Sequence, residues 1–171
     1  MADDPPFISL RFAYADPPYV GKSWRYNHPD AVRWDDPTEH IALMHEFDAG
    51  YDGWALSANA TTLPQLLPDA PPGTRVAVWV KPFAAYKRNV RVAYTWEPVL
   101  WSRTAPRRPG DPVGRDHLSC PITMRRGLVG AKPEAFARWL FVLLGWQPGD
   151  ELTDVFPGTG VIGRTAEGIM L

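Results

Sequence analysis

Residues 151–163 read Glu-Leu-Thr-Asp-Val-Phe-Pro-Gly-Thr-Gly-Val-Ile-Gly, the pattern of a short strand that runs into a glycine-rich turn. Gly158, Gly160 and Gly163 fit the G-x-G-x-x-G template between a strand and a helix. Glycines allow a ligand to approach the backbone closely, and the amino terminus of a helix favours a negative group. The stretch predicts either a nucleotide-type ligand or a tight packing turn.

The length of the chain beyond this turn argues against a dinucleotide cofactor. Such a site needs a second strand that ends in an acidic residue about 20 positions beyond the glycines. Only eight residues follow Gly163. This length therefore argues against a dehydrogenase.

Upstream of the turn, strand and helix patterns alternate with short connections. Strands are expected at residues 8–15, 53–57, 75–80, 93–101 and 151–156, helices near 36, 61 and 133, and a polar, aromatic loop at 20–35. About a dozen residues separate 75–80 from 93–101, too few for a helical crossover, so these two strands should be antiparallel. The alternation predicts an α/β sandwich with a mainly parallel sheet of about five strands and one antiparallel hairpin.

Boundary signals mark the two longest helices. Asp36 is expected to cap the first of them, with Glu39 completing a capping box. Pro133 opens the most clearly amphipathic helix, which Gly145 ends. Residues 102–131 show no periodicity, and irregular segments of this length are usually functional or disordered.

The composition is that of one ordinary globular domain over residues 1–171, with 45% hydrophobic and 22% charged side chains. No apolar run approaches the ~20 residues of a membrane span, and the first residues lack the features of a signal peptide, so a cytoplasmic protein is expected. The single Cys120 excludes an internal disulfide and a thiolate-based zinc site. The four histidines lack metal-ligand spacing, so no metal is expected.

The net charge of −1 conceals an uneven distribution. Residues 75–138 carry 13 basic and 4 acidic side chains, and both flanking segments are acidic. Lys and Arg release counterions from nucleic acid, so this distribution favours a phosphate-bearing partner. A solvated, arginine-rich loop would produce the same distribution.

A second motif, Asp16-Pro17-Pro18-Tyr19 (DPPY), follows the first strand, and ligands of open α/β sheets bind at the carboxyl ends of strands. The two prolines fix their φ angles and remove two backbone donors. The carbonyls and the Asp16 carboxylate therefore present only acceptors, which suits an amino group. A proline-rich strand exit, with Tyr19 as a packing residue, is the alternative interpretation.

Together, the two motifs resemble those of the amino-methyltransferases that use S-adenosylmethionine to methylate exocyclic amines of nucleobases. The signature of that family is an Asp/Asn/Ser-Pro-Pro-aromatic tetrapeptide, and here it precedes the cofactor motif, as in the permuted β class of DNA methyltransferases. Residues 96–101, 132–134 and 148–160 also resemble stretches of that class, so the resemblance spans nearly the whole chain. It implies a Rossmann-like methyltransferase three-layer sandwich with S-adenosyl-L-methionine as its cofactor.

The resemblance also implies roles for individual residues. Asp16 and the Pro17 carbonyl would accept the two amine hydrogens, Pro18 would complete the rigid tetrapeptide, and Tyr19 would stack on the base. An Asp at the first position favours adenine N6 over cytosine N4. The cofactor would contact the first motif, the start of a helix and the glycine turn, that is Ala15, Asp16, Lys132, Pro133, Asp154, Phe156, Pro157, Gly158, Thr159 and Gly160.

Two of these residues would bind the methionine part of the cofactor. Asp154 would face its ammonium group, and Lys132 would lie near its carboxylate unless it is a surface lysine. The sheet of the family has seven strands, and no room remains for two of them after the cofactor turn. The ribose would therefore be held differently, by Glu167 or by the segment before Lys132, or the cofactor would bind weakly.

The basic segment 102–131 occupies the place of the target-recognition region in the permuted class. Nucleic-acid contacts, with DNA favoured over RNA, are expected from Arg103, Arg107, Arg108, Arg115, Arg125 and Arg126. Two functions stay open at this point. One is a compact adenine-N6 methyltransferase, and the other is a catalytically silent methyltransferase fold that serves as a nucleic-acid-binding or partner subunit; a homodimer is compatible with either.

Overall fold

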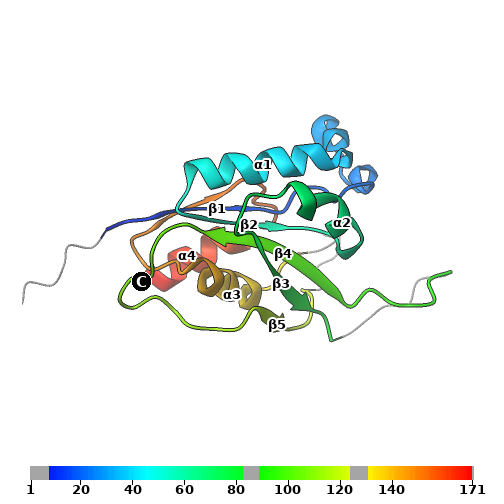
Figure 1. Cartoon of the computed structure of the whole chain (residues 1–171). Coiled ribbons are helices and arrows are strands. Elements are labelled where there is room, and N and C mark those ends of the chain that lie inside the picture. Colours follow the sequence, from blue (N-terminus) through cyan, green and yellow to red (C-terminus); the bar gives the residue numbers. More distant parts are fainter. Residues whose placement is uncertain (1–7, 83–88, 124–130, 171) are drawn as a thin grey trace, which may run out of the picture.

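The computed structural model describes residues 8–82, 89–123 and 131–170, which form an α/β sandwich (Figure 1). Within these residues, six strands form one sheet in the order β5-β3-β4-β2-β1-β6. The strands are β1 (Arg11–Ala15), β2 (Gly53–Ser57), β3 (Arg75–Val80), β4 (Trp96–Arg103), β5 (His117–Ser119) and β6 (Glu151–Asp154). β1 pairs in parallel with β2 and β6, and β4 runs antiparallel to β2 and β3, which confirms the predicted antiparallel hairpin.

Helices cover both faces of the sheet and make the fold a three-layer sandwich. α1 (Pro37–Gly50) and α2 (Leu63–Leu66) lie on one face, whereas α3 (Glu134–Leu144) and α4 (Val161–Met170) lie on the other (Figure 1). Short 3-10 helices occupy the connections: η1 (Ser23–Arg25), η2 (Pro29–Asp35), η3 (Ala60–Thr62) and η4 (Leu67–Asp69). No helix among the described residues is long and apolar enough to cross a membrane.

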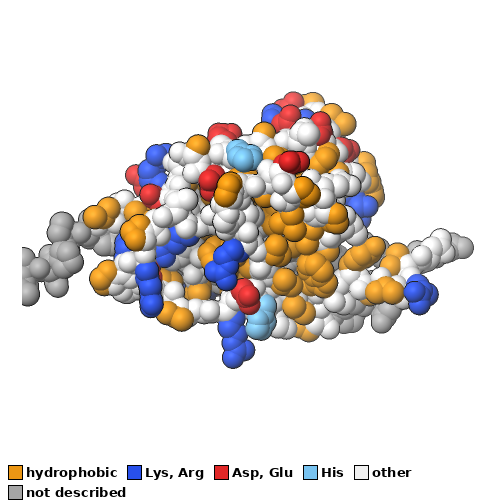
Figure 2. All heavy atoms as spheres, in the orientation of Figure 1, with side chains coloured by type: hydrophobic (Ala, Val, Ile, Leu, Met, Phe, Trp, Pro, Cys, Tyr) orange, Lys and Arg blue, Asp and Glu red, His pale blue; other side chains and the backbone are white. Residues whose placement is uncertain are grey.

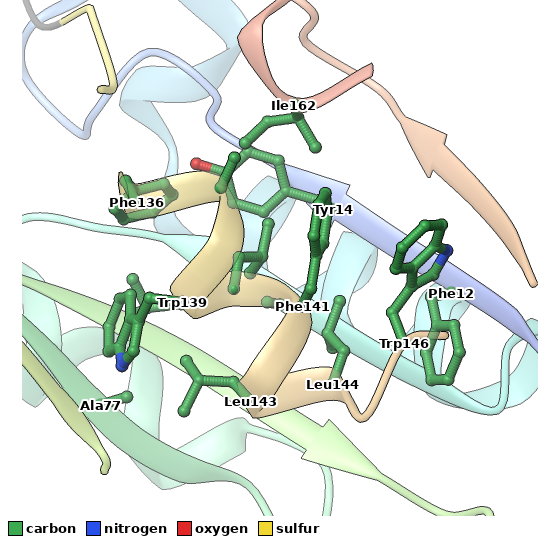
Figure 3. Close-up of a cluster of buried hydrophobic side chains, with 14 of the residues drawn as sticks. Phe12, Tyr14, Ala77, Phe136, Trp139, Phe141, Leu143, Leu144, Trp146 and Ile162 are labelled. Carbon is green, nitrogen blue, oxygen red and sulfur yellow. The ribbon is translucent and has the colours of Figure 1, made fainter. Parts of the chain in front are cut away.

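Each face of the sheet has its own apolar core. Phe12 and Tyr14 of β1 pack against Phe136 and its neighbours on α3 (Figure 3). On the opposite face, Phe47 of α1 and Trp54 of β2 belong to a second buried cluster. Because successive side chains of a strand point to opposite faces, each central strand contributes to both cores.

The start of α1 confirms the predicted Asp36 cap but not the predicted capping box. Asp36 caps the helix by accepting the Thr38 backbone N–H (2.9 Å). Glu39 does not close a capping box, and its carboxylate pairs with Arg33 instead. The Asp36 N–H is not available to Glu39, because it donates to the Arg33 carbonyl at the end of η2 (3.2 Å).

Residues 102–131 are not irregular throughout, contrary to expectation. β4 extends to Arg103, and β5 occupies residues 117–119, where it pairs in parallel with β3. β5 is the strand by which the sheet exceeds the predicted number. Three residues are too few to produce a recognisable alternation in a sequence, so this strand could not be predicted from periodicity.

A buried ion pair, which we call the Arg108–Asp150 clasp, closes the amino-terminal end of the sheet. Arg108 donates to both Asp150 oxygens (2.7 and 2.6 Å), and the same carboxylate accepts the backbone N–H groups of Leu10 and Gln147. The Asp150 side chain is fully buried. Because the Leu10 N–H donates to this carboxylate and not to a strand carbonyl, β1 begins at Arg11 and not at residue 8 as predicted.

Asp150→Ala should lower the free energy of unfolding by about 3–5 kcal/mol, because it removes the buried carboxylate partner of Arg108. Chemical denaturation measures this change. Glu151→Ala is the matched control, since Glu151 makes only an exposed pair with Arg11, and it should stay within about 1 kcal/mol of the wild type. Equal effects of the two substitutions would contradict a structural role for the clasp.

Candidate functional site

The two sequence motifs meet at the carboxyl ends of parallel strands. Residues 16–19, hereafter the tetrapeptide, follow β1, and the glycine turn follows β6, with Tyr14 paired to Asp154. Ligands of open α/β sheets bind at this edge. Both motifs line one cleft of about 590 Å³. That volume lies within the ~300–1,000 Å³ typical of small-molecule sites.

The third wall of the cleft is the segment of 3-10 helices between β1 and α1. Its lining residues are Tyr26, His28, Asp30, Ala31, Arg33 and Trp34. Trp34 packs edge-on against Phe156 beside the glycine turn, with ring centroids 5.1 Å apart. The sequence alone assigns no role to this loop. Its aromatic residues were the available signal, because ligand pockets are lined mainly by apolar and aromatic side chains.

Asp154, at the end of β6, carries an acceptor that no described residue satisfies. Its Oδ1 atom is buried without a hydrogen-bond partner, and its side chain lines the cleft. Burial, together with the nearby Asp16 carboxylate, raises the pKa of Asp154 to about 6, although a hydrogen bond from the Phe156 backbone opposes the shift. A buried acceptor costs free energy unless it is paired. The position therefore favours a ligand that brings a cation or a hydrogen-bond donor.

The glycine turn depends on backbone conformations that favour glycine. Gly158 and Gly160 have positive φ angles of 49° and 70°, in a region that other residues rarely adopt. The Gly160 N–H donates to the Pro157 carbonyl (2.6 Å), and α4 starts at the next residue. Pro157, Gly158 and Thr159 line the cleft. The turn thus brings bare backbone and the amino terminus of α4 to the cleft.

Four charged side chains lie together at the tetrapeptide, and we call them the charge cluster. They are Asp16 of the tetrapeptide itself, Lys81, Glu97 and Lys132. The Lys132 ammonium lies 3.2 Å from Asp16 Oδ1 and 3.1 Å from Glu97 Oε2. Lys81, just after β3, pairs with the other oxygen of Glu97. Tyr19 donates its hydroxyl hydrogen to Glu97 (3.0 Å). The cluster therefore links the tetrapeptide to β3, β4 and the start of α3.

The sequence left open whether Lys132 is a surface lysine. It is not, because its side chain is only 6% exposed. It also lines the cleft, so its contact with a ligand carboxylate stays a prediction. Glu97 received no role from the sequence. The signal that could have identified it is a carboxylate inside a strand whose next residues, Pro98, Val99 and Leu100, are buried, because buried charges are normally paired.

Opposing effects set the protonation states of these groups. Burial raises the pKa of Asp16, and Lys132 counteracts the shift. Burial also acts to raise the pKa of Glu97, but Lys132 and Lys81 outweigh it and hold that pKa below its usual value. Burial and the two nearby carboxylates raise the pKa of Tyr19 well above its ordinary value. The Tyr19 phenol therefore stays protonated and acts as a donor.

Arg103 and Arg108, two of the predicted nucleic-acid contacts, take part in ion pairs of the fold, and their contact with nucleic acid stays a prediction. Arg103 lies opposite Gly53, the first residue of β2, and so at the end of the sheet away from the cleft. It pairs there with Asp111 (2.7 Å), and Arg108 forms the clasp. Both guanidinium groups are largely buried and ion-paired, so they stabilise the fold.

The remaining predicted contacts fall into two groups. Arg107 and Arg115 are exposed and line a separate groove beside Arg103, so their role stays a prediction. Arg125 and Arg126 lie outside the described residues. Figure 2 shows basic side chains interspersed with acidic and apolar ones on the face in view, with no continuous basic patch there. In the part of the chain that the structure describes, no group of three or more His, Cys, Asp or Glu side chains could hold a metal ion.

Comparison with known proteins identifies the fold. No protein-family model and no curated protein matches the chain. Among solved structures, the crystal structure of M1.HpyAVI matches with a TM-score of 0.59 at 16% identity, over 95% of this chain and 78% of that chain. The crystal structure of the M1.HpyAVI–SAM complex matches over the same shares with a TM-score of 0.62 at 14% identity. The chain therefore has the Rossmann-like methyltransferase sandwich that its sequence predicts.

Asp154→Asn should stabilise the protein above pH 6. The folded-state pKa of about 6 exceeds the ordinary value near 4. The protonated form therefore contributes stability that is fully present below about pH 4 and is lost as the pH rises through about 6. At pH 8 the variant should gain roughly 1 kcal/mol, because one pKa unit corresponds to about 1.4 kcal/mol and solvent partly screens this group.

Denaturant unfolding from pH 4 to pH 8 measures this difference. The gain of the variant over the wild type should shrink as the pH falls toward 4. A difference that stays constant over the whole range would show that Asp154 does not carry a raised pKa.

Proposed function

We propose that the protein is an S-adenosylmethionine-dependent methyltransferase that acts on an exocyclic amino group of a nucleobase, with adenine N6 in DNA as the favoured target. The observation that carries the proposal is the position of two motifs on one cleft. Asp16 and Pro18 of the tetrapeptide, at the end of β1, and the glycine turn, at the end of β6, line the same cavity. A methyl donor and an amine acceptor need this proximity.

The cleft fits the proposed cofactor in its donor and acceptor groups. The unsatisfied Asp154 oxygen suits the ammonium group of S-adenosylmethionine, which would pair with it and favour its ionised form. The aromatic wall of Trp34 and Phe156 suits a purine ring. M1.HpyAVI, which shares the fold, has been crystallised with SAM. S-adenosylmethionine supplies an electrophilic methyl group on a positively charged sulfur.

The tetrapeptide would supply the hydrogen-bond acceptors that the substrate amine needs. An exocyclic amine of adenine is conjugated with its ring and is a weak nucleophile. The Asp16 carboxylate and the Pro17 carbonyl would accept its two hydrogens and direct its lone pair toward the methyl group, while Tyr19 would stack on the base. This reaction requires no covalent intermediate, so positioning and electrostatics would supply most of the rate.

Access to the base sets a further requirement. An amine in duplex nucleic acid is stacked and paired, so the target base would have to leave the helix at a cost of a few kcal/mol. The exposed Arg107 and Arg115 lie at the opposite end of the sheet from the cleft, beside Arg103. Contacts with the nucleic-acid backbone near the cleft would therefore involve other residues, such as Arg33 on the wall of the cleft.

S-adenosylhomocysteine should bind the wild-type protein in a calorimetric titration, and Asp154→Asn should bind it at least ~10-fold more weakly. A hydrogen bond to a charged group contributes about 1.5–3 kcal/mol, which corresponds to this loss. Glu151→Gln, on the same strand but outside the cleft, is the matched control and should bind like the wild type. No binding to the wild type at millimolar ligand would refute the proposed cofactor site.

Asp16→Ala should reduce methyl transfer by about 10²–10³-fold, because it removes a charged acceptor from the reacting amine. The assay is transfer of a labelled methyl group from S-adenosylmethionine to adenine-containing single-stranded and duplex DNA, followed by nucleoside mass spectrometry. N6-methyladenine is the expected product, whereas N4-methylcytosine would identify cytosine as the target base. A wild-type chain that binds S-adenosylhomocysteine but methylates neither DNA nor RNA would instead be a silent partner subunit.

A further inference from the structure

The ammonium group of Lys132 has its three hydrogen-bond donors matched by three acceptor residues, two in the tetrapeptide and one on β4. Glu97 and Tyr19 each place one oxygen within 3.3 Å of Nζ, and both Asp16 oxygens lie 3.2 Å from it, with Oδ1 as the hydrogen-bond acceptor. An ammonium group has three donors and no acceptor. The Tyr19 hydroxyl can accept from Lys132 because its own hydrogen goes to Glu97. Lys132 is therefore fully used by two residues of the tetrapeptide and one of β4.

Rigid elements hold this ammonium group from the sides. Its nitrogen lies 5.3 Å from the ring centroid of Trp79 on β3 and 5.4 Å from that of Phe136 on α3. The ring of Tyr19 lies 5.8 Å away. Cations are attracted to aromatic faces within about 6 Å. Strand, helix and tetrapeptide thus meet at one buried charge, although burying a lysine is costly unless the charge is paired.

We propose that Lys132 is the positioning residue of the tetrapeptide: its ammonium group holds the Asp16 carboxylate, as an ionised acceptor, and the Tyr19 ring in the geometry that receives the substrate amine. Glu97 anchors Lys132 from β4, and Lys81 balances the charge of Glu97. This role rests on the proposed methyl transfer to an amine. It differs from contact with the cofactor, because Lys132 acts on the substrate side through other residues.

The electrostatics of the cluster support this role. A buried carboxylate tends to bind a proton, and a protonated Asp16 would lose acceptor capacity. Burial does raise the pKa of Asp16, and Lys132 is the largest opposing influence. Glu97 raises the pKa further, and the Tyr19 hydroxyl lowers it. A carboxylate offers about four lone-pair positions, so Asp16 can accept from Lys132 and still accept from an amine.

The charges around Asp16 come from every packed element. Glu97 and Lys81 lie at the paired ends of β4 and β3, and Lys132 precedes α3. Tyr14 of β1 and Asp154 of β6 also interact with Asp16, and both titrate above their ordinary values. Lys132 is the cation that contacts Asp16 directly among the described residues. Its removal should therefore change Asp16 more than the removal of Lys81.

Carboxyl ¹³C NMR titration of Asp16 tests the role without an activity assay. The Asp16 signal is assigned by its absence in Asp16→Asn. Lys132→Met should raise the pKa of Asp16 by roughly 1–3 pH units, the usual effect of losing an adjacent opposite charge. Lys81→Met, the matched control, removes a cation that pairs only with Glu97 in this cluster and should have a much smaller effect. Equal titrations of the two variants would overturn the proposal.

A second variant, in which the pKa of Asp16 is expected to shift in the opposite direction, provides the test if Lys132→Met does not fold. Glu97→Gln removes the competing carboxylate and leaves the Lys132 charge to Asp16, so the pKa of Asp16 should fall. An unchanged or raised pKa in Glu97→Gln would overturn the role of the cluster.

Kinetic assays of methyl transfer then distinguish the positioning role of Lys132 from the proposed methyltransferase function. In Lys132→Met, kcat at neutral pH should fall about 10²-fold, the size of effect that misplacement of a reacting group produces. The KM for S-adenosylmethionine should stay near the wild-type value, and the rate should recover at alkaline pH as Asp16 ionises. Loss that does not depend on pH would contradict the positioning role. A wild-type chain without turnover, but with the expected NMR shifts, would refute the methyltransferase function and leave the Lys132–Asp16 contact intact.

Discussion

The pairing of β1 with β6 is the interaction on which the candidate site depends. β1 is the first strand of the chain and β6 the last, and their parallel register sets Tyr14 beside Asp154. A slip of one residue would turn the side chains of a strand to the opposite face. The Arg108–Asp150 clasp binds Leu10 at the other end of these strands, and the Glu151 N–H donates to the Leu10 carbonyl (2.9 Å). Polar contacts at the amino-terminal end thus stabilise the register that forms the cleft.

The charged groups of the molecule serve two different ends of this sheet. At the amino-terminal end, arginines and aspartates form buried pairs that close the fold. At the carboxyl end, burial of Asp16 and Asp154 raises the pKa of both groups, and one Asp154 oxygen has no partner among the residues that the structure describes. Unsatisfied or shifted groups reduce stability and are concentrated at functional sites. The two apolar cores on either face of the sheet offset this cost.

Local signals in the sequence predicted elements well where one or two residues determine the conformation. β2 and β3 begin and end at the predicted residues, Asp36 caps α1, and Gly145 ends α3 with a positive φ of 70°. Predictions were wrong where a contact between residues distant in the chain decided the outcome. Asp150 sets the start of β1, and short pairing with β3 creates β5.

The candidate site shows the same division. Asp16, Asp154 and the glycines could be identified in the sequence because prolines, glycines and carboxylates have local chemical consequences. Glu97 and the wall around Trp34 carried only weaker signals, a carboxylate inside a strand and a loop rich in aromatic residues, because their roles depend on which strands and loops become neighbours. Arg103 and Arg108 illustrate the limit of a charge count. A count of charges shows how many cations a segment carries, but only packing shows that Arg103 and Arg108 are already paired.

The sequence by itself therefore determined the α/β alternation, the order of the two motifs and the acceptor character of the tetrapeptide, since these follow from residue types and their spacing. Only the tertiary structure decided that both motifs line one cleft, that Lys132 is bound to Asp16 and Glu97, and that Arg103 and Arg108 form ion pairs at the other end of the sheet. The physical reason is that hydrogen bonds, ion pairs and burial act over a few ångströms in space. Residues far apart in the chain acquire these interactions only when strand pairing brings them together.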